Sequence, residues 1–323
     1  MLLDDRDRDL LDGWQREFPL VSRPFAAIGA AVDLSEADTL ARLRRLLAAN
    51  ALSRIGAVVR PNTIGASTLA ALAVPPAEVE AAARAMVMEA GVNHAYQREH
   101  AYNLWFVVTA ADRAGVDAAI ARIELRTRRH ALVLPMLRDF HIDLGFPLFE
   151  RGARRERAPT PGTTGASVEP GDRVLLSSIE RGLPLTSTPF SDVANQIGWS
   201  EDDVLIRLKR LIQARIISRF GLVVRHRAFG YTNNAMVVWD LPDDDLVRLA
   251  HRFVEQESVT LCYERPRRIG WPYNLFTMIH ARDRAHALQT VAALKLLAPK
   301  CVGHDILFST RCFRQRGARL SAA

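Results

Sequence analysis

The sequence predicts an α+β fold in which one unit of about 150 residues is written twice along the chain. Three observations lead to this prediction. Residues 18–61 align with residues 183–226 without a gap, and their prolines, serines, glycines and arginines coincide. Within each copy, apolar residues first recur at helical spacing and then form short β-rich runs. Between the copies, a stretch rich in Arg, Pro, Gly, Thr and Ser has no apolar period, as is typical of a linker.

Each copy opens with three short helices. In the first copy, Leu10, Leu11 and Trp14 give the apolar face of the first helix. The second helix begins at Pro24, since proline is favoured at a helix start. The third begins after Ser35, a capping residue followed three positions later by an acidic residue. The corresponding residues of the second copy are Leu175, Leu176, Ile179, Pro189 and Ser200.

A sandwich of β-α-β-β-α-β order follows the helices in each copy. In the first copy we expect a β-rich run at 55–59, strands at 67–74, 102–109 and 131–141, and helices at 77–89 and 116–127. In the second copy we expect a β-rich run at 220–224, strands at 235–241, 273–280 and 305–314, and helices at 243–257 and 285–297. This order is that of the ferredoxin-like sandwich, and the three helices before it resemble a winged helix-turn-helix module. The chain is therefore predicted to be a tandem repeat of these two parts, a pseudo-dimer within one polypeptide.

The repeat also predicts where the domains begin and end. The expected segments are helix-turn-helix module 1 at 1–54, ferredoxin-like domain 1 at 55–150, a linker at 151–170, helix-turn-helix module 2 at 171–219 and ferredoxin-like domain 2 at 220–323.

The composition argues against several classes of function but does not identify one. No run of about 18 apolar residues occurs and the N-terminus is acidic, so we expect a cytoplasmic protein that does not enter a membrane. The three cysteines lack a CxxC spacing, which argues against a disulfide framework or structural zinc. The net charge of +7, mostly from arginine, suits nucleic acid and a polycarboxylate or phosphate ligand equally well.

A helix-turn-helix module joined to a ferredoxin-like sandwich resembles the leucine-responsive (Lrp/AsnC) transcription regulators, so DNA binding is the first hypothesis to weigh. The third helices offer cations at Arg42, Arg44, Arg45, Arg207, Lys209 and Arg210. Acidic clusters at both helix starts, where base-reading side chains would enter the groove, weaken this hypothesis. The two sets of cations also differ, whereas a symmetric operator needs equivalent halves. We expect no DNA binding, although a heme- or siroheme-responsive regulator remains the alternative function and a tetrapyrrole carrier a third.

The sandwiches carry polar, aromatic and cationic residues too densely for a plain core. The most distinctive runs are HAYQREHAYNLWFV at 94–107, RHRAFGYTNNAMVVW at 225–239, LCYERPRR at 261–268 and WPYNLFTMIH at 271–280. Here the chain resembles the siroheme decarboxylases, enzymes of alternative heme and d1-type heme synthesis, in the form that fuses two subunits on one polypeptide. The resemblance covers essentially the full chain.

The resemblance implies removal of the carboxyl groups of two acetate side chains of siroheme, giving 12,18-didecarboxysiroheme. Such an octacarboxylate ligand needs fixed cations, and its flat ring needs apolar and aromatic walls. The residues expected to bind substrate are Arg98, Asn103, Trp105, Arg225, Arg227, Tyr231, Tyr263, Arg265, Arg267, Trp271, Tyr273 and Asn274. We expect no cofactor and no metal beyond the iron of the substrate, because the tetrapyrrole ring can itself accept the electrons.

Each acetate carbon must be protonated after it loses carbon dioxide, and histidine suits this step at cellular pH. His94, His100 and His226 are the candidate catalytic residues, and whether each acts as an acid or as an iron ligand is left open. The copies differ at these positions: His94 aligns with Leu261, His226 aligns with Pro61, and His100 has no counterpart. This inequality predicts one productive pocket per pseudo-dimer, assembled across the two sandwiches with histidines from different copies. The oligomeric state beyond the pseudo-dimer is left open.

Overall fold

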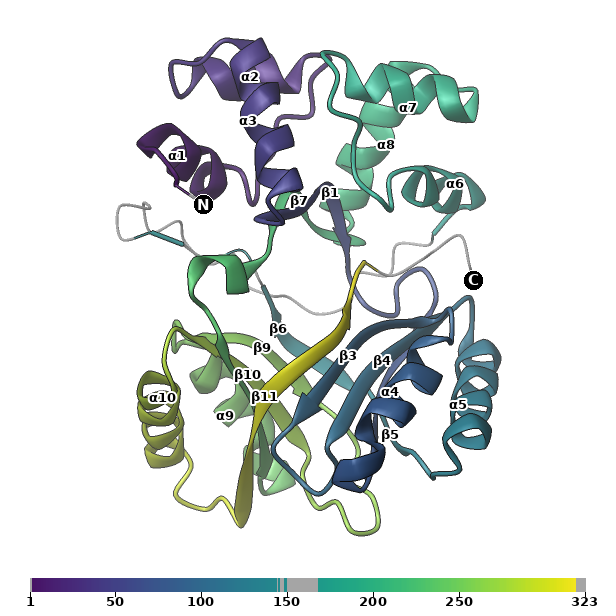
Figure 1. The fold of residues 1–323 in the computed structure, drawn as a ribbon, viewed down its shortest axis with the longest axis vertical. Helices are drawn as coiled ribbons and strands as arrows, with labels where there is room; N and C mark the ends of the chain where they lie inside the picture. The colour runs from purple at the N-terminus through teal and green to yellow at the C-terminus, as the bar shows by residue number, and fades with distance from the viewer. Residues whose placement is uncertain (1, 144, 146–147, 150–167, 318–323) are drawn as a thin grey trace. The chain divides into compact units, whose positions relative to one another are not determined.

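The computed structural model describes residues 2–143, 145, 148–149 and 168–317, and the contacts among them divide the chain into two units (Figure 1). One unit comprises the described residues of Met1–Ile64 and Gly145–Phe229, and the other those of Gly65–Leu144 and Gly230–Ala323. Each unit therefore draws on both copies of the repeat. The predicted linker at 151–170 lies outside the described residues except for its last three, of which Pro170 begins a helix.

The first unit contains both helix-turn-helix modules. Its elements are α1 (Asp5–Gly13), α2 (Pro24–Ala30), α3 (Glu36–Ala48), β1 (Leu52–Val59), α6 (Pro170–Ser178), α7 (Pro189–Ile197), α8 (Glu201–Gln213), β7 (Ile217–Val224) and the 3-10 turn η2 (His226–Phe229). The predicted helix starts are confirmed: Ser35 and Ser200 cap α3 and α8, and Pro24 and Pro189 occupy the first position of their helices.

Strands β1 and β7 join the two modules as an antiparallel ribbon. Gly56 lies opposite Gly221 in its register. A Cβ on Gly221 would lie 2.4 Å from the carbonyl oxygen of Trp14, so the chain before β1 can approach the ribbon only where this position is glycine.

The second unit contains both ferredoxin-like sandwiches. The first copy contributes β2 (Ala66–Leu72), the 3-10 turn η1 (Pro76–Glu78), α4 (Val79–Val87), β3 (Val92–Arg98), β4 (Leu104–Ala110), α5 (Arg113–Thr127), β5 (Leu132–Pro135) and β6 (Arg138–Ile142). The second copy contributes β8 (Asn233–Asp240), α9 (Asp243–Val254), β9 (Val259–Glu264), β10 (Leu275–Ala281), α10 (Arg284–Leu297) and β11 (Gly303–Gln315). Strands β3 and β9, for which no separate range was predicted, complete the expected β-α-β-β-α-β order.

The two copies share one nine-stranded sheet with the order β5-β2-β4-β3-β11-β8-β10-β9-β6. Strand β11 pairs with β8 of its own copy through its first half and with β3 of the other copy through its second half. In the same way, β5 pairs with β2 of its own copy, whereas β6 pairs with β9 of the other. Only Met136 and Leu137 separate β5 from β6, so the two ends of the sheet must meet and the sheet curls.

The predicted single strand at 131–141 is wrong in this detail, because the chain breaks between β5 and β6. Pro135 ends β5, and proline has no N–H with which to continue the ladder. Its counterpart in the unbroken β11 is Phe308.

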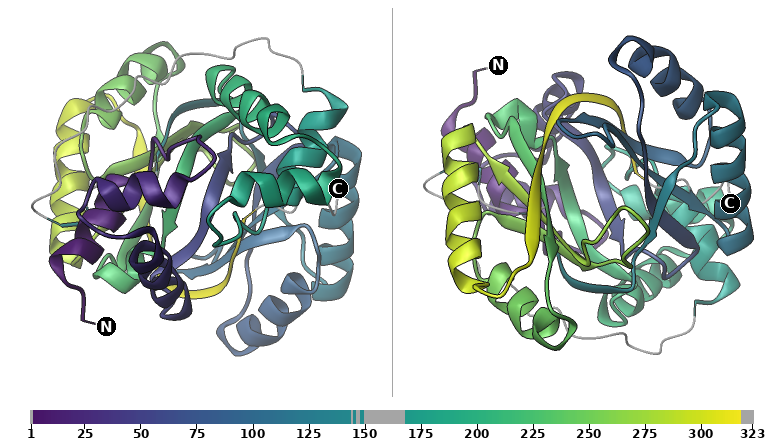
Figure 2. Two further views of the ribbon diagram at one scale, coloured as in Figure 1. Left: turned by 90° about the horizontal axis from the view of Figure 1, so that it is seen from above. Right: turned by 90° about the horizontal axis from the view of Figure 1, so that it is seen from below.

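The helices cover one face of the sheet and leave the other to a core made by both copies. Figures 1 and 2 show α4 and α5 outside one half of the sheet and α9 and α10 outside the other, each pair over its own apolar core. A third apolar cluster lies on the opposite, inner face, and we call it the shared core. It consists of Ala71, Trp105, Leu132 and Leu134 of the first copy and Met236, Val238, Trp271, Phe276 and Leu307 of the second.

Candidate active site

His100 lies at the turn after β3, against aromatic residues of both copies. The backbone N–H of Tyr102 donates a hydrogen bond of 2.9 Å to His100 Nδ1, and the two rings stack with centroids 6.2 Å apart. The ring of Trp271, from the second copy, meets His100 edge-on at 5.5 Å. The His100 side chain is 21% exposed, so it can meet both the core and a ligand.

A carboxylate of the second copy faces the other nitrogen of this imidazole. Asp305 Oδ2 lies 3.7 Å from His100 Nε2, and the Tyr273 hydroxyl donates a hydrogen bond of 2.5 Å to the same oxygen. Burial, together with the bond to Asp305, raises the pKa of Tyr273 far above its ordinary value, so the phenol remains a donor. His100, Asp305 and Tyr273 form a group that we call the polar trio.

The two predicted tryptophans lie beneath the polar trio. Trp105 and Trp271 are each 1% exposed, and their rings lie 5.4 Å apart at a tilt of 54°. Trp105 Nε1 donates to the Tyr102 carbonyl at 2.6 Å, and the ring of Tyr273 meets Trp271 at 4.9 Å. The structure therefore brings four predicted site residues together, namely His100, Trp105, Trp271 and Tyr273.

Arg98 and Arg265 occupy equivalent positions on the inner face, at the ends of β3 and β9. Arg98 donates to the Leu307 carbonyl at 3.0 Å, and Arg265 donates to the Leu134 carbonyl. Each bond joins one copy to the other. Both arginines are more than nine-tenths buried, and burial lowers the pKa of Arg265 to about 10, which still leaves it charged at neutral pH.

Each of these arginines lies over a tyrosine two residues earlier in the chain. The guanidinium of Arg98 is 5.6 Å from the ring centre of Tyr96, and that of Arg265 is 5.3 Å from the ring centre of Tyr263. His94 stacks on Tyr96 at 6.3 Å. Since Ala95 and Cys262 belong to the helix-covered cores, strand alternation places His94, Tyr96 and Tyr263 on the inner face.

The two predicted asparagines bind backbone rather than face the polar trio. The Asn103 amide accepts from the N–H of Val74 at 3.1 Å and donates to its carbonyl at 2.8 Å. Asn274 binds Leu241 in the same way, at 3.0 and 2.9 Å, and also donates to Asp243. These bonds hold the segment after β2 or β8 against the residue before β4 or β10.

The remaining predicted residues lie elsewhere. Arg267 forms salt bridges with Asp240 and Asp243. Tyr231 receives the guanidinium of Arg282 at 5.2 Å from its ring centre. The other three, Arg225, His226 and Arg227, belong to the first unit, where His226 is 8% exposed and opens η2.

Among the predicted ligand-binding residues, Arg225, Arg265 and Trp271 each carry a buried N–H group without a hydrogen-bond partner among the described residues. These groups are Nε of Arg225, Nε of Arg265 and Nε1 of Trp271. Buried donors are normally satisfied, so such atoms suit a ligand that is rich in acceptor oxygens.

Sequence reasoning missed Asp305. Strand register shows its equivalent in the first copy: Asp305 lies opposite Val238 in β8, as Leu132 lies opposite Ala71 in β2. The sequence pattern that pointed to Asp305 was its departure from the apolar alternation of β11. The contact between Asp305 and His100 could not be predicted from the sequence, because it depends on strand exchange between the copies.

Four of the six cations of the third helices are engaged within their own modules, and Arg44 instead donates to the Leu185 carbonyl at 2.6 Å. Arg42 and Arg45 form salt bridges with Asp7, a fully buried carboxylate of α1. In the second copy, Arg207 and Arg210 do the same with Asp172 of α6.

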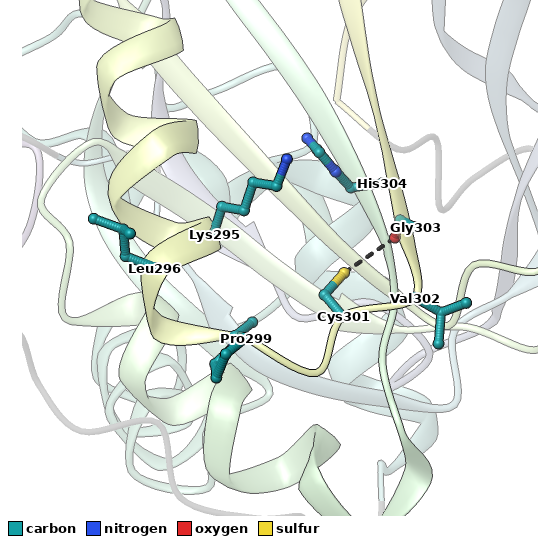
Figure 3. A pocket seen from close by; sticks show the side chains of 8 residues that line it. Lys295, Leu296, Pro299, Cys301, Val302, Gly303 and His304 are labelled. Atoms are coloured by element: carbon teal, nitrogen blue, oxygen red, sulfur yellow. Dashed lines mark hydrogen bonds between the residues drawn. The ribbon is translucent and has the colours of Figure 1, made fainter.

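A cavity of about 380 Å³ lies between the end of α10 and the start of β11 (Figure 3). Lys295, Cys301 and His304 are the polar side chains that line it. His304 stacks on Trp239, and burial with the nearby Lys295 charge lowers its pKa. None of the residues predicted to act on substrate lines this cavity.

Two searches of the described part of the chain were negative. No three His, Cys, Asp or Glu side chains are grouped so that they could hold a metal ion. No helix has the length and apolar character needed to cross a membrane.

Comparison with known proteins first defines the class. A family model described as "AsnC-like ligand binding domain" matches residues 64–141 and 228–314. A second, described as "Siroheme decarboxylase NirDL-like HTH domain", matches residues 7–52 and 172–217. Together with the fold, these matches define a protein with two AsnC-like ligand-binding domains and two helix-turn-helix modules on one chain.

Full-length relatives narrow the class to one family. The chain is 47% identical over 322 residues to the siroheme decarboxylase NirDL subunit of Paracoccus pantotrophus, covering 98% of each. It is 49% identical over 146 residues to the siroheme decarboxylase NirD subunit of Pseudomonas aeruginosa, covering 45% of this chain and 97% of that one. The chain belongs to the siroheme decarboxylase family.

A solved structure supports the fold. The crystal structure of the siroheme decarboxylase NirDL in co-complex with an iron-uroporphyrin III analogue superposes with a TM-score of 0.70 at 22% sequence identity, covering 98% of this chain and 93% of that one. The predicted fold, two helix-turn-helix modules and two ferredoxin-like sandwiches in one chain, is confirmed.

Proposed function

We propose that this chain is a carboxy-lyase that removes the carboxyl groups of two acetate side chains of siroheme and leaves 12,18-didecarboxysiroheme. One observation carries the proposal: a siroheme decarboxylase is 47% identical to the chain over 98% of both sequences. The product would serve the synthesis of d1-type heme or the alternative route to heme.

The chemistry sets three requirements. The bond between the acetate methylene and its carboxyl carbon breaks, and carbon dioxide leaves without the bonding electrons. These electrons pass to the methylene carbon and the conjugated ring, and a proton then converts the carbon to a methyl group. The protein must therefore bind a polycarboxylate, hold a flat ring and supply a proton. No cofactor is needed in this scheme, because the substrate provides the electron acceptor.

The inner face of the sheet offers groups for the first two requirements. The unpartnered N–H groups of Arg265 and Trp271 suit carboxylate oxygens, and Arg225 carries a third such group in the first unit. Tyr102 and Tyr273 are partly exposed beside the buried tryptophans and could contact the tetrapyrrole ring.

We propose that His94, His100 and His226 act on the substrate and that at least one of them delivers the proton. Anaerobic incubation of the chain with siroheme should give a mass loss of two carbon dioxide units and a change in the visible spectrum. Alanine at each histidine should lower turnover, by about 10²- to 10⁴-fold for the proton donor. His130→Ala is the matched control, because that side chain is fully exposed.

Two outcomes would contradict these proposals separately. An unchanged mass of siroheme with the parent chain would overturn the proposed activity. Full turnover in all three single variants would overturn only the assignment to histidine.

We further propose that the helix-turn-helix modules do not bind DNA. Arg42, Arg45, Arg207 and Arg210 neutralise buried carboxylates of their own modules, which leaves them poorly placed for phosphates. Gel-shift assays at low salt should show no complex with duplex DNA. A complex that weakens steeply as salt rises would favour the regulator instead.

The cellular location and assembly stay predictions. We propose that the chain acts in the cytoplasm and does not bind membranes. Cell fractionation would test this proposal, and light scattering would measure any further self-association.

A further inference from the structure

We propose that Asp305 is a positioning residue that fixes His100 as a neutral imidazole with its proton on Nε2, so that His100 serves as a hydrogen-bond donor to the substrate. This inference rests on the proposed function for its kinetic part only. Its structural part concerns the ligand-free chain and can be measured without siroheme.

The hydrogen bond from Tyr102 assigns the tautomer. A backbone N–H can only donate, so His100 Nδ1, 2.9 Å away, must accept with its lone pair. A neutral imidazole whose Nδ1 accepts carries its single proton on Nε2. In this state Nε2 has no lone pair for iron. Loss of its proton would leave an imidazolate, so the ring donates a hydrogen bond rather than transferring a proton.

Asp305 supplies the second constraint on the ring. Its Oδ2 lies 3.7 Å from His100 Nε2, and a negative charge there favours the orientation that turns an N–H dipole toward it. The separation is longer than a hydrogen bond, so the Nε2 proton can still bond to a ligand oxygen. The Tyr273 hydroxyl holds the same carboxylate oxygen at 2.5 Å and fixes its place.

Near the polar trio, two other carboxylates are paired with arginines, and the neighbouring histidine lies near a lysine. Glu99, next to His100 in sequence, binds Arg284 through two hydrogen bonds. Asp240, which faces Tyr273, forms a salt bridge with Arg267. Beside Asp305 lies His304, which faces Lys295.

Within the part of the chain that the structure describes, the arrangement occurs once. His100 comes from the first copy, whereas Asp305 and Tyr273 come from the second. At the pseudo-symmetric place, the first copy has Leu132 in place of Asp305, and the second copy has four extra residues where the His100 turn would be. This difference matches the prediction of one productive pocket per pseudo-dimer.

The tautomer can be read by ¹⁵N NMR of the ligand-free chain, with His100 assigned through His100→Gln. We expect a pyrrole-type Nε2 and a pyridine-type Nδ1 in the parent chain and in Asp305→Glu. We expect Asp305→Asn to show mixed tautomers or exchange broadening. Glu99→Gln is the control and should match the parent. A parent spectrum with protonated Nδ1, or an unchanged Asp305→Asn spectrum, would overturn the inference.

Turnover provides a second readout, because glutamine can place an amide N–H near the position of Nε2 but cannot act as an imidazole acid. His100→Gln should retain turnover within about tenfold of the parent, whereas His100→Ala should lose much more. Asp305→Asn should lower kcat by about tenfold to a hundredfold with little change in KM, and Asp305→Glu should restore most of it. Equal loss in the glutamine and alanine variants would refute the donor role.

The two kinds of failure are distinguishable. If the parent chain fails to convert siroheme, the proposed function is wrong, yet the NMR result still decides the position of the His100 proton.

Discussion

At the scale of single residues, Asn103 and Asn274 show how a conspicuous polar side chain can serve the fold. Each amide binds both the N–H and the carbonyl of one backbone residue, Val74 or Leu241. The paired geometry repeats in the two copies although the surrounding loops differ in length. This regularity favours a shared structural role over a role in an asymmetric site.

We expect Asn274→Ala to lower the free energy of unfolding by about 2 kcal/mol, because the buried N–H of Leu241 loses its partner and its carbonyl keeps only the bond from Arg267. The KM for siroheme of the folded variant should not change. Urea unfolding and steady-state kinetics measure the two quantities. Gln289→Ala, on the exposed face of α10, is the control and should stay within about 0.5 kcal/mol of the parent. A raised KM with unchanged stability would instead support substrate binding by Asn274.

The sequence identified two members of the polar trio but not the third. His100, Trp271 and Tyr273 were predictable because aromatic and titratable residues crowd the ends of short strands. Asp305 was not, because one carboxylate in a strand has meaning only when the residue that its side chain contacts is known. That residue belongs to the other copy, and its approach depends on how β11 is exchanged.

At the scale of elements, a buried carboxylate on the first helix of each module binds arginines of the third helix. Asp172 is fully buried, shares a capping box with Glu169 at the start of α6, and binds Arg207 and Arg210 of α8. Burial raises the pKa of Asp172, but hydrogen bonds from Arg210, the Glu169 backbone and Arg207 outweigh it, so the pKa lies below its ordinary value.

We expect Asp172→Asn to lower the free energy of unfolding by about 2–3 kcal/mol at neutral pH, since Arg207 and Arg210 lose their buried counter-charge and keep only the more exposed Glu169. The folded pKa is depressed, so this stabilisation is present above the unfolded pKa of about 4 and is lost as the pH falls through the folded pKa. The parent and the variant should therefore converge in acid. Urea unfolding from pH 7 to pH 3 measures this, with the exposed Asp202→Asn as control. A stability difference that does not shrink in acid would contradict the charge-based explanation.

The elements themselves were largely predictable, and the exceptions have local causes. Serine caps and helix-starting prolines located α2, α3, α7 and α8 because these residues act on neighbouring backbone groups. The break at Pro135 was missed because an apolar run on both sides masked the missing N–H. The strand with which β6 pairs could not be inferred from the sequence, because the pairing of an edge strand depends on the tertiary structure.

At the scale of the whole molecule, neither unit is made by one copy alone. The ribbon of the first unit pairs β1 with β7, one strand from each copy. In the second unit, β6 and the second half of β11 pair with strands of the other copy, and the shared core takes side chains from both. The duplication therefore supplied two halves of each unit, and the inequality of the halves placed a histidine and a carboxylate together, as His100 and Asp305, at one of the two equivalent places.

This arrangement predicts the behaviour of a chain cut within the predicted linker, as residues 1–160 and 161–323. Co-expressed halves should associate 1:1 and recover siroheme turnover, because the exchanged strands and the shared core find their partners in trans. Each half alone should be inactive. Leu307→Asp, which places a charge in the shared core, should prevent association, whereas Leu296→Asp, at a position 83% exposed, should not. Size-exclusion chromatography and native mass spectrometry measure the stoichiometry. If each half stays monomeric, folds cooperatively and does not associate with the other, strand exchange is not needed for either half to fold.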